Sequence, residues 1–361
     1  MGIALFDSRT ALEPLRPQID EAISGVVESG AFILGPSVEA FEAEYAAAVG
    51  VPHAVGVANG TEAITIALRA LGVGPGDEVV VPSFTYFASA EAIPAVGAVP
   101  VFCDVDPQTF VSTPEQVKAA MTPRTKAVVA VHLFGNLAPV REIEALGVPV
   151  VEDAAQAAGS AGPEGRPGAL GTIATHSFYP SKNLGAFGDG GAITTSDAAL
   201  AERVRMLRFH GSRDKVVYQE AGYNSRLDEI QAAVLRVMLP ELEGWAAHRL
   251  AAGERYRSAL EGAVGLPEPL PGTDPAWHLY VIRTEDPDAL AAGLAGRGIE
   301  ARGYYRTPVH LQPAMECWHG ASASLPGTDE AARTHLAIPV SATISDAQVD
   351  EVAGAVLELL G

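Results

Sequence analysis

One of the four lysines in this chain, Lys182, lies in a segment suited to covalent chemistry. It follows the aromatic-containing residues 177–181, and a glycine-rich run at 185–191 comes soon after it. Upstream, an apolar run at 148–151 leads directly into an acidic pair that ends at Asp153. Pyridoxal phosphate needs a lysine amine that condenses with its aldehyde and a carboxylate that keeps its ring nitrogen protonated. We therefore expect Lys182 and Asp153 to hold this cofactor.

Both residues also have an ordinary structural interpretation. Lys182 could be a surface lysine, as Lys118, Lys126 and Lys215 are expected to be, and Asp153 could simply cap the helix that follows it. Two features favour the cofactor. Glycines beside Lys182 allow the backbone to approach a ligand closely, and a carboxylate directly after a buried strand needs a cationic partner.

The remaining motifs exclude several other chemistries. The glycine run does not match G-x-G-x-x-G at the start of a helix, because residues 192–195 are typical of a strand, and there is no G-x-x-x-x-G-K-[ST]. His132, His210 and His310 are dispersed, without H-E-x-x-H or paired Cys/His spacing, so we expect no metal site. No G-x-S-x-G motif supports a serine nucleophile.

A phosphate-binding position is expected at residues 59–61, Asn-Gly-Thr, which precede a helix. This segment could be a plain helix cap and turn. It could also seat a phosphate on the amides of Gly60, Thr61 and Glu62, at the positive end of the helix, with Ser177 adding a hydroxyl. An aromatic that stacks on the cofactor ring is expected among Phe84, Tyr86 and Phe87, and the residues alone do not choose among them. The groups expected to contact the cofactor phosphate and ring are thus backbone amides, hydroxyls and one aromatic ring.

Short apolar runs alternate with helical patterns through the first two thirds of the chain. The expected strands are 54–58, 78–81, 99–103, 127–131, 148–152, 173–177 and 192–195. The expected helices are one with an apolar face over 19–27 that stops at Gly30, one capped by Ser37, and others near 61–71, 87–96, 114 onward and 140–146. This pattern predicts an α/β fold with a mainly parallel central sheet and helices on both faces. Ligands of such sheets bind beyond the carboxyl ends of the strands, where Tyr86, Asp153 and the Lys182 segment fall.

From Arg226 onward the pattern becomes helical, with a break at Pro240 and a second helix to about Leu260. We expect a large cofactor-binding domain over 1–240, including an N-terminal helical segment, and a smaller α+β domain over 241–361. In the smaller domain we expect a strand over 278–282, a helix over 287–295 and a last helix capped by Ser345.

Composition narrows the possible partners. The formal charge of −20 argues against nucleic acid and against an anionic membrane surface. Cys103 and Cys317 have no C-x-x-C spacing, and no signal peptide or membrane-spanning run is found, so we expect a cytoplasmic protein with reduced thiols.

Seven stretches of the chain resemble the DegT/DnrJ/StrS sugar aminotransferases, which are fold-type I pyridoxal phosphate enzymes. The matching stretches are 32–36, 58–61, 81–86, 152–156, 177–184, 222–233 and 308–313. The resemblance runs from about Phe6 to the C-terminal helix, and these stretches together are highly specific. The resemblance implies the fold-type I architecture. It also implies a transaminase and not a dehydratase, because dehydratases of this family have histidine at the position where this chain has Lys182.

The resemblance also implies roles for individual residues. Lys182 would be the Schiff-base lysine and proton shuttle, and Asp153 would pair with the pyridine nitrogen. The other implied cofactor contacts are Gly60, Thr61 and Ser177 at the phosphate, Tyr86 on the ring face, Gln156 near the ring hydroxyl, and Asn224. In this family Asn224 reaches the neighbouring subunit's cofactor, which implies a homodimer with shared active sites. Arg226, Tyr305 and His310 match positions near the sugar nucleotide.

The activity implied by the resemblance is transfer of an amino group from L-glutamate to a ketosugar carried on a nucleoside diphosphate, with 3-keto slightly favoured over 4-keto. Two alternatives remain open: amination of a ketocyclitol or another ketone without a nucleotide, and a regulatory protein that binds the cofactor without turnover. The chain departs from the family at Arg306, where relatives often have proline, and at Phe209, where asparagine is common. We expect both positions to lie near the substrate.

Overall fold

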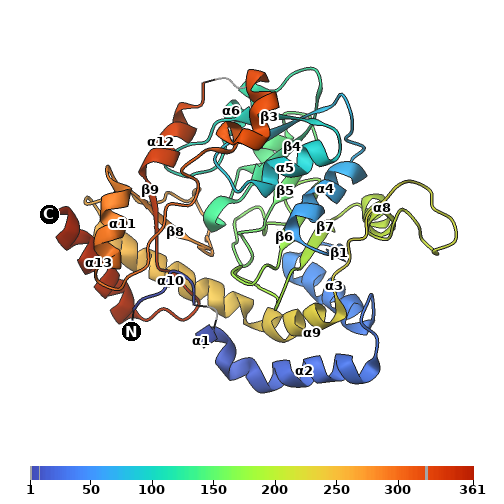
Figure 1. The fold of residues 1–361 in the computed structure, drawn as a ribbon, viewed down its shortest axis with the longest axis horizontal. Helices are drawn as coiled ribbons and strands as arrows, with labels where there is room; N and C mark the ends of the chain where they lie inside the picture. Colours follow the sequence, from blue (N-terminus) through green and yellow to red (C-terminus); the bar gives the residue numbers. More distant parts are fainter. Residues whose placement is uncertain (1, 8, 322–323) are drawn as a thin grey trace.

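A computed structural model describes residues 2–7, 9–321 and 324–361 and places a seven-stranded sheet at the centre of the molecule (Figure 1). The strand order is β1-β7-β6-β5-β4-β2-β3. Only β7 runs antiparallel to its neighbours, β1 and β6, and the other neighbouring pairs are parallel. The strands are β1 (His53–Val57), β2 (Glu78–Pro82), β3 (Val99–Cys103), β4 (Thr125–Val131), β5 (Val150–Asp153), β6 (Ile173–Ser177) and β7 (Gly191–Thr195). The predicted α/β class with a mainly parallel sheet is confirmed.

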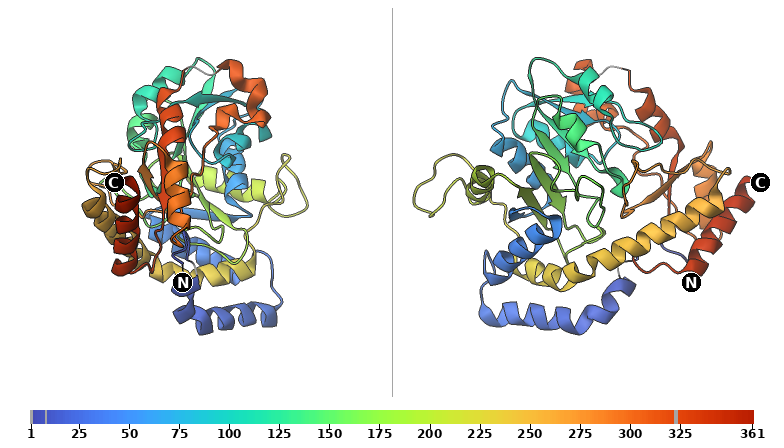
Figure 2. Two further views of the ribbon diagram at one scale, coloured as in Figure 1. Left: turned by 60° about the vertical axis from the view of Figure 1, so that its left-hand side comes forward. Right: turned by 180° about the vertical axis from the view of Figure 1, so that it is seen from behind.

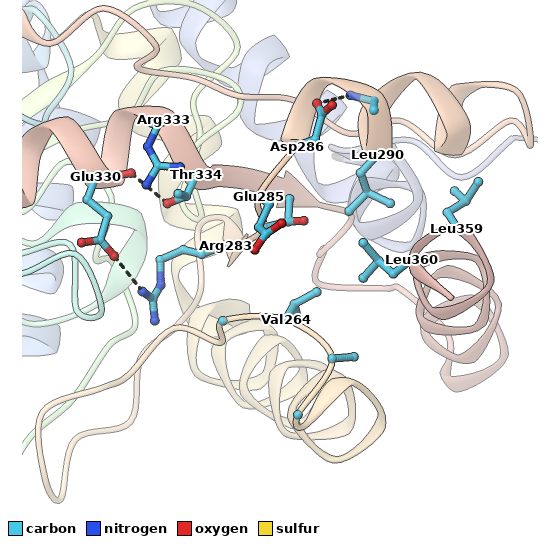
Figure 3. A pocket seen from close by; sticks show the side chains of 15 residues that line it. Val264, Arg283, Glu285, Asp286, Leu290, Glu330, Arg333, Thr334, Leu359 and Leu360 are labelled. Atoms are coloured by element: carbon cyan, nitrogen blue, oxygen red, sulfur yellow. Dashed lines mark hydrogen bonds and ion pairs between the residues drawn. The ribbon is translucent and has the colours of Figure 1, made fainter.

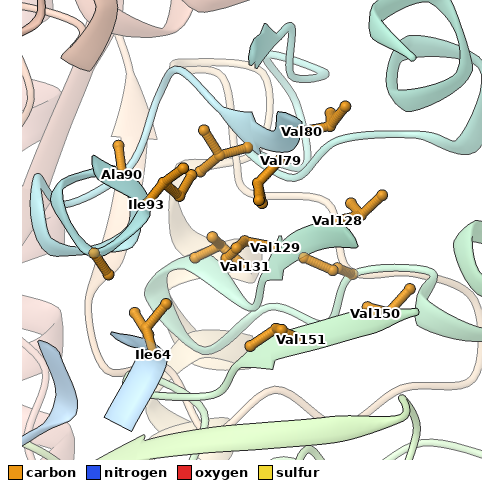
Figure 4. Packing of buried hydrophobic residues seen from close by; sticks show 14 of the residues in the cluster. Ile64, Val79, Val80, Ala90, Ile93, Val128, Val129, Val131, Val150 and Val151 are labelled. Atoms are coloured by element: carbon orange, nitrogen blue, oxygen red, sulfur yellow. The ribbon is translucent and has the colours of Figure 1, made fainter. Parts of the chain in front are cut away.

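The central strands are buried along both faces, which explains why their sequences are continuously apolar. In β2 and β4, valines such as Val79, Val80, Val128 and Val129 are fully buried. Figure 4 shows these side chains packing with Ile64 and Ile93 from neighbouring helices. Burying branched side chains of this size stabilises the fold by roughly 1.5–3 kcal/mol each. The sheet is therefore a rigid base for the residues at its strand ends.

Two groups of helices pack against the sheet. Helix α4 (Gly60–Ala70) contacts α5 (Ala88–Ala95), α8 (Ala198–Arg208) and strands β5 to β7, whereas α6 (Pro114–Ala120) and α7 (Val140–Glu144) contact each other and β2, β3 or β5. Asn59 caps α4, because its Oδ1 accepts the amide of Glu62 at 2.8 Å. Helix α8 was not predicted from the sequence; it begins after its cap, Asp197.

The prediction that Ser37 caps the third helix is wrong. The N-terminal helices are α1 (Arg9–Leu12), α2 (Arg16–Ser29) and α3 (Pro36–Val49), and the residue before α3 is Gly35. The carboxylate of Glu229 accepts the amides of Gly35, Ser37 and Val38, so a distant acid takes the place of a local cap. Helix α2 does end at Gly30, whose φ of 66° suits a glycine.

A second, smaller sheet lies in the last third of the chain. It pairs β8 (Tyr280–Arg283) with β9 (His335–Ile338) in antiparallel register, and α11 (Pro287–Ala295), α12 (Pro326–Thr334) and α13 (Asp346–Leu360) surround it. The long helix α10 (Leu242–Leu260) follows α9 (Glu229–Met238) and runs toward α13 (Figures 1 and 2). Ser345 caps α13 as predicted, and its Oγ accepts the amide of Gln348. The domain boundary near residue 240 stays a prediction.

Within the described residues, none of the helices has both the length and the apolar character that crossing a membrane requires.

Candidate active site

Asp153 and the Lys182 segment start from neighbouring strands. Asp153 is the last residue of β5, and it stands opposite Thr175 of β6 in parallel register. Strand β6 ends at Ser177, only five positions before Lys182. Because parallel strands end at the same edge of the sheet, both groups lie beyond this edge. The Asp153 carboxylate is close enough to act electrostatically on the Lys182 amine.

The Asp153 carboxylate is held from two directions. It is 6% exposed, Oδ1 accepts the amide of Ala155 at 3.2 Å, and Oδ2 accepts the hydroxyl of Ser89 at 2.7 Å. Ser89 in turn lies 3.0 Å, oxygen to oxygen, from the hydroxyl of Thr85. A buried carboxylate needs such donors, since each satisfies an oxygen that water no longer reaches. Sequence reasoning missed Ser89 because it lies 64 residues before Asp153 and carries no motif of its own.

The Lys182 amine sits in a partly buried position that changes its acidity. Burial lowers the pKa of the amine to about 8, although the Asp153 carboxylate acts in the opposite direction. The Lys182 amide donates to the carbonyl of Tyr179 at 2.8 Å. The Asn183 amide group donates to the carbonyls of Ala158 and Ala276, which anchors the lysine segment to two other parts of the chain. An amine with this pKa is partly neutral near pH 7 and can act as a nucleophile or base.

The start of α4 lies against the end of β6. A Cβ atom added at Gly60 would stand 2.8 Å from Cβ of Ser177, so only glycine permits this approach. The amide of Glu62 is already used by the Asn59 cap, whereas amides in the first turn of a helix, such as those of Gly60 and Thr61, have no partner within the helix. The hydroxyl oxygen of Ser177 accepts the amide of Tyr179 at 3.3 Å. These groups form a cradle that fits a phosphate.

Gln156 connects the cofactor-binding edge to a cluster of aromatic rings. Its Oε1 accepts the amide of Phe134 at 2.7 Å, and its Nε2 donates to the Tyr305 hydroxyl at 3.1 Å. The rings of Phe134 and Tyr305 stack with centroids 5.8 Å apart. Phe134 has a φ of 60°, which is unusual for a residue with a large side chain. Strain of this kind is typical of binding sites, and here it aims the Phe134 amide at Gln156.

Tyr86 and His310 both lie near the end of β2. Tyr86 is 58% exposed, so its ring is available to cover a ligand. His310 pairs through Nδ1 with the hydroxyl of Ser83, and its ring centroid lies 6.1 Å from that of Phe102. Of the three aromatics considered from the sequence, Phe84 is fully buried, which leaves it unavailable for stacking on a ligand.

Asn224 and Arg226 are not brought to the Lys182 group within one chain. Arg226 donates to Oδ1 of Asn224, and its guanidinium carbon lies 5.8 Å from the centre of the Phe209 ring. Among the described residues, no hydrogen bond or ion pair joins either residue to Asp153 or Lys182. Both follow the long segment that projects from α8 in Figure 1.

The other departure from the family pattern, Arg306, turns toward the small sheet's helices. It donates to the Asp288 carboxylate at 2.9 Å and to the carbonyls of Ala332 and Arg333. The structure thus gives Arg306 a structural role near α11 and α12.

A cavity of about 790 Å³ is lined by other residues than those of this site. Figure 3 shows Arg283, Glu330, Arg333 and the C-terminal Leu359 and Leu360 around it, all in the last third of the chain. Over the described residues, there is no group of three or more His, Cys, Asp or Glu side chains arranged to hold a metal ion.

The structure has a mainly parallel α/β sheet, an acid at the end of one strand, and a lysine on the connection after the neighbouring strand, near a helix start with free amides. This arrangement is the one expected of a pyridoxal-phosphate-dependent enzyme. The family is shown by comparison with known proteins. Residues 14–357 match the DegT/DnrJ/EryC1/StrS aminotransferase family, and the chain belongs to it. The protein is therefore a pyridoxal-phosphate-dependent aminotransferase.

Proteins named as transaminases match this chain over almost their full lengths. The dTDP-3-amino-3,4,6-trideoxy-alpha-D-glucose transaminase of Streptomyces venezuelae is 46% identical over 99% of this chain and 96% of its own. A UDP-N-acetyl-3-dehydro-alpha-D-glucosamine 3-aminotransferase of Acidithiobacillus ferrooxidans is 42% identical over 98% and 96%. The structure of S. venezuelae DesV in complex with a ketimine intermediate has a TM-score of 0.95 and 46% identity, covering 99% of this chain and 98% of that one.

Proposed function

We propose that the protein transfers an amino group from an amino acid, L-glutamate, to the keto carbon of a sugar carried on a nucleoside diphosphate. The observation that carries the proposal is the placement of the Lys182 amine and the Asp153 carboxylate at neighbouring strand ends within electrostatic reach. When bound, pyridoxal phosphate supplies an aldehyde that takes up the amino group and a ring that accepts electrons.

The roles of the two central residues follow from their surroundings. Lys182 would hold the cofactor through Nζ, and the same amine, when free, would carry the proton that the transfer moves. Its lowered pKa supports this role, because a base works best when its pKa is near the working pH. Asp153 holds the ring nitrogen, and the hydrogen bond from Ser89 keeps its Oδ2 in place.

The remaining cofactor contacts follow the geometry of the strand ends. The amides and hydroxyl of Gly60 and Thr61, with the Ser177 hydroxyl, hold the phosphate at the start of α4. Tyr86 covers the ring, and Gln156 lies near the ring hydroxyl. The exposure of Tyr86 and the hydrogen bond between Gln156 and the Tyr305 hydroxyl support these two assignments.

Tyr305 and His310 contact the sugar nucleotide in this proposal. Burial raises the pKa of the Tyr305 hydroxyl, so this group acts as a neutral hydrogen-bonding partner. A 3-keto sugar is favoured as the acceptor, because the names of the two relatives above both place the amino group at carbon 3.

A homodimer completes the site in this proposal. Asn224 of one subunit reaches the phosphate of the partner's cofactor, and Arg226 reaches the partner's sugar nucleotide. Exposed apolar side chains in the projecting segment support an interface there. Val216, Val217 and Tyr218 are 78%, 58% and 60% exposed, which is costly for a surface that stays in water. The cytoplasm remains the expected location.

A substrate panel tests the acceptor. Purified protein with L-glutamate is offered 3-keto and 4-keto sugars on dTDP or UDP and, separately, free ketocyclitols. Glutamate consumption and product mass are then measured. We expect turnover with a nucleotide-linked 3-keto sugar. Turnover with a free ketocyclitol only would contradict the nucleotide requirement, and bound cofactor without transfer from any amino acid would favour the regulatory alternative.

A further inference from the structure

A second cavity, of about 290 Å³, opens on the lysine segment from the side of α10. Its lining includes Lys182 and Asn183 from that segment, Arg249 from α10, and the apolar side chains of Phe6 and Trp245. Small-molecule sites start at roughly 300 Å³, so the volume suits a small ligand. The cavity therefore places a candidate ligand beside Lys182.

Arg249 is a buried cation without an acidic partner in the described chain. It is 7% exposed, and its Nη1 donates to the carbonyls of Trp277 and Val340 at 3.1 and 3.4 Å. Its Nε is buried and has no hydrogen-bond partner among the described residues. A guanidinium binds a carboxylate through two parallel N–H groups, and the edge that carries Nε is the one left without a protein acceptor.

The same short segment anchors Arg249 and the residue after Lys182. The Asn183 amide group donates to the carbonyl of Ala276 at 3.0 Å, and Arg249 donates to the next carbonyl, that of Trp277. The third residue of this segment, 276–278, is His278. The positive charges of Lys182 and Arg249 both act on its buried ring. The two cations consequently face one small region of the molecule.

The charge balance of this region favours an anionic ligand. Burial lowers the pKa of the Arg249 guanidinium to about 10, still well above neutral pH, so the group remains charged. The pKa of His278 lies well below its ordinary range, mainly because the ring is buried and also because Lys182 and Arg249 are near it. The His278 ring therefore adds no charge. Asp7, the acid that lines the cavity, accepts the amide of Thr10 at 3.0 Å instead of pairing with Arg249.

We propose that the cavity between Lys182 and Arg249 binds a carboxylate of the amino donor, with the Arg249 guanidinium donating to it. An α-amino acid carries its carboxylate two bonds from its nitrogen, so a carboxylate on Arg249 directs the nitrogen toward the Lys182 side of the cavity. The apolar side chains of Phe6 and Trp245 contact the aliphatic part of the donor. This inference rests on the proposed function, because it assumes an amino-acid donor.

The test uses maleate, a dicarboxylate that has no amino group to transfer. Its dissociation constant is measured by calorimetry on the cofactor-loaded wild-type protein and on Arg249→Lys. Lysine keeps the charge but loses the two-pronged geometry, and we expect maleate binding to weaken by roughly tenfold or more. The matched control is Arg255→Lys on the same helix, an exposed arginine that pairs with Asp350, and it should leave the constant unchanged.

A wild-type measurement covers the case in which Arg249→Lys fails to fold. In a crystal structure with maleate, a carboxylate oxygen should lie within hydrogen-bond distance of a guanidinium nitrogen of Arg249. Maleate elsewhere in the protein, or equal binding to wild type and Arg249→Lys, would overturn the inference. If wild type transfers nitrogen but maleate avoids Arg249, only this inference fails. If maleate binds Arg249 and an amino acid donates its nitrogen, but no nucleotide-linked ketosugar accepts it, only the proposed function fails.

Discussion

The Ser89 hydroxyl donates a 2.7 Å hydrogen bond to Oδ2 of Asp153, and both side chains are buried. Ser89 lies in the first turn of α5, so this helix fixes the orientation of a carboxylate at the end of β5. The Thr85 hydroxyl, 3.0 Å from that of Ser89, extends the arrangement. The acid at the strand end is thus held by an element from another part of the sequence.

Replacing Ser89 with alanine should weaken cofactor binding. The substitution removes one donor to a buried carboxylate, which typically costs about 1–3 kcal/mol. Part of this cost appears as a lower affinity for pyridoxal phosphate, which is measured by titrating cofactor-free protein and following its visible absorption. Ser258→Ala, in an exposed serine of α10, is the matched control. Equal affinities for Ser89→Ala and wild type would show that Ser89 does not support Asp153.

The rate at which cofactor-free protein takes up pyridoxal phosphate should depend on pH with a midpoint near 8. Only the neutral Lys182 amine attacks the aldehyde, and burial lowers the pKa of this amine to about 8. The rate should therefore be half-maximal near pH 8 and level off roughly one pH unit above it. Stopped-flow absorption across the pH range measures this profile. A rate that keeps rising to pH 10, as an ordinary lysine would give, contradicts the assignment.

Gly60→Ala should lower the affinity for the cofactor phosphate. The added Cβ would stand 2.8 Å from Cβ of Ser177, so the start of α4 must move away from the end of β6. We expect weaker binding of both pyridoxal phosphate and free inorganic phosphate, measured by calorimetry. The matched control is Gly25→Ala in α2, where an added Cβ meets no atom within 4 Å. Unchanged phosphate affinity in Gly60→Ala would place the phosphate elsewhere.

Mixing two inactive variants tests whether the active sites are shared between subunits. A mixed dimer contains one Lys182→Ala subunit and one Asn224→Ala subunit. If Asn224 acts across the interface, one of its two active sites has both an intact lysine and an intact asparagine. If Asn224 acts within its own subunit, neither site has both. Random re-association should then restore roughly one quarter of wild-type activity. The mixture is unfolded and refolded together, and activity is compared with each variant treated alone. A mixture as inactive as its components argues that each chain supplies its own Asn224.

The local patterns in the sequence were enough to predict the strand ends. The apolar runs that lead into Asp153 and Ser177 form β5 and β6, and Gly30 and Ser345 end and begin helices as predicted. These features depend on neighbours along the chain. The roles assigned to Gln156, Tyr86 and the substrate residues came from the family resemblance and stay predictions.

Contacts between distant segments were not predictable in the same way. Ser89 contacts Asp153 across 64 residues, and Glu229 replaces the expected Ser37 cap from 192 residues away. The burial of Arg249 was not predictable either, since a single arginine on a helix is usually exposed. Such contacts depend on how helices are placed over the sheet, and a single sequence does not specify this placement in any local pattern.

The most direct test of the central claim is to reduce the purified, cofactor-loaded protein with borohydride and locate the cofactor by peptide mass spectrometry. Reduction makes the link between lysine and cofactor permanent, and the chain has only four lysines. The account predicts the added mass on the peptide that contains Lys182. Added mass on Lys118, Lys126 or Lys215, or on no lysine, would contradict it.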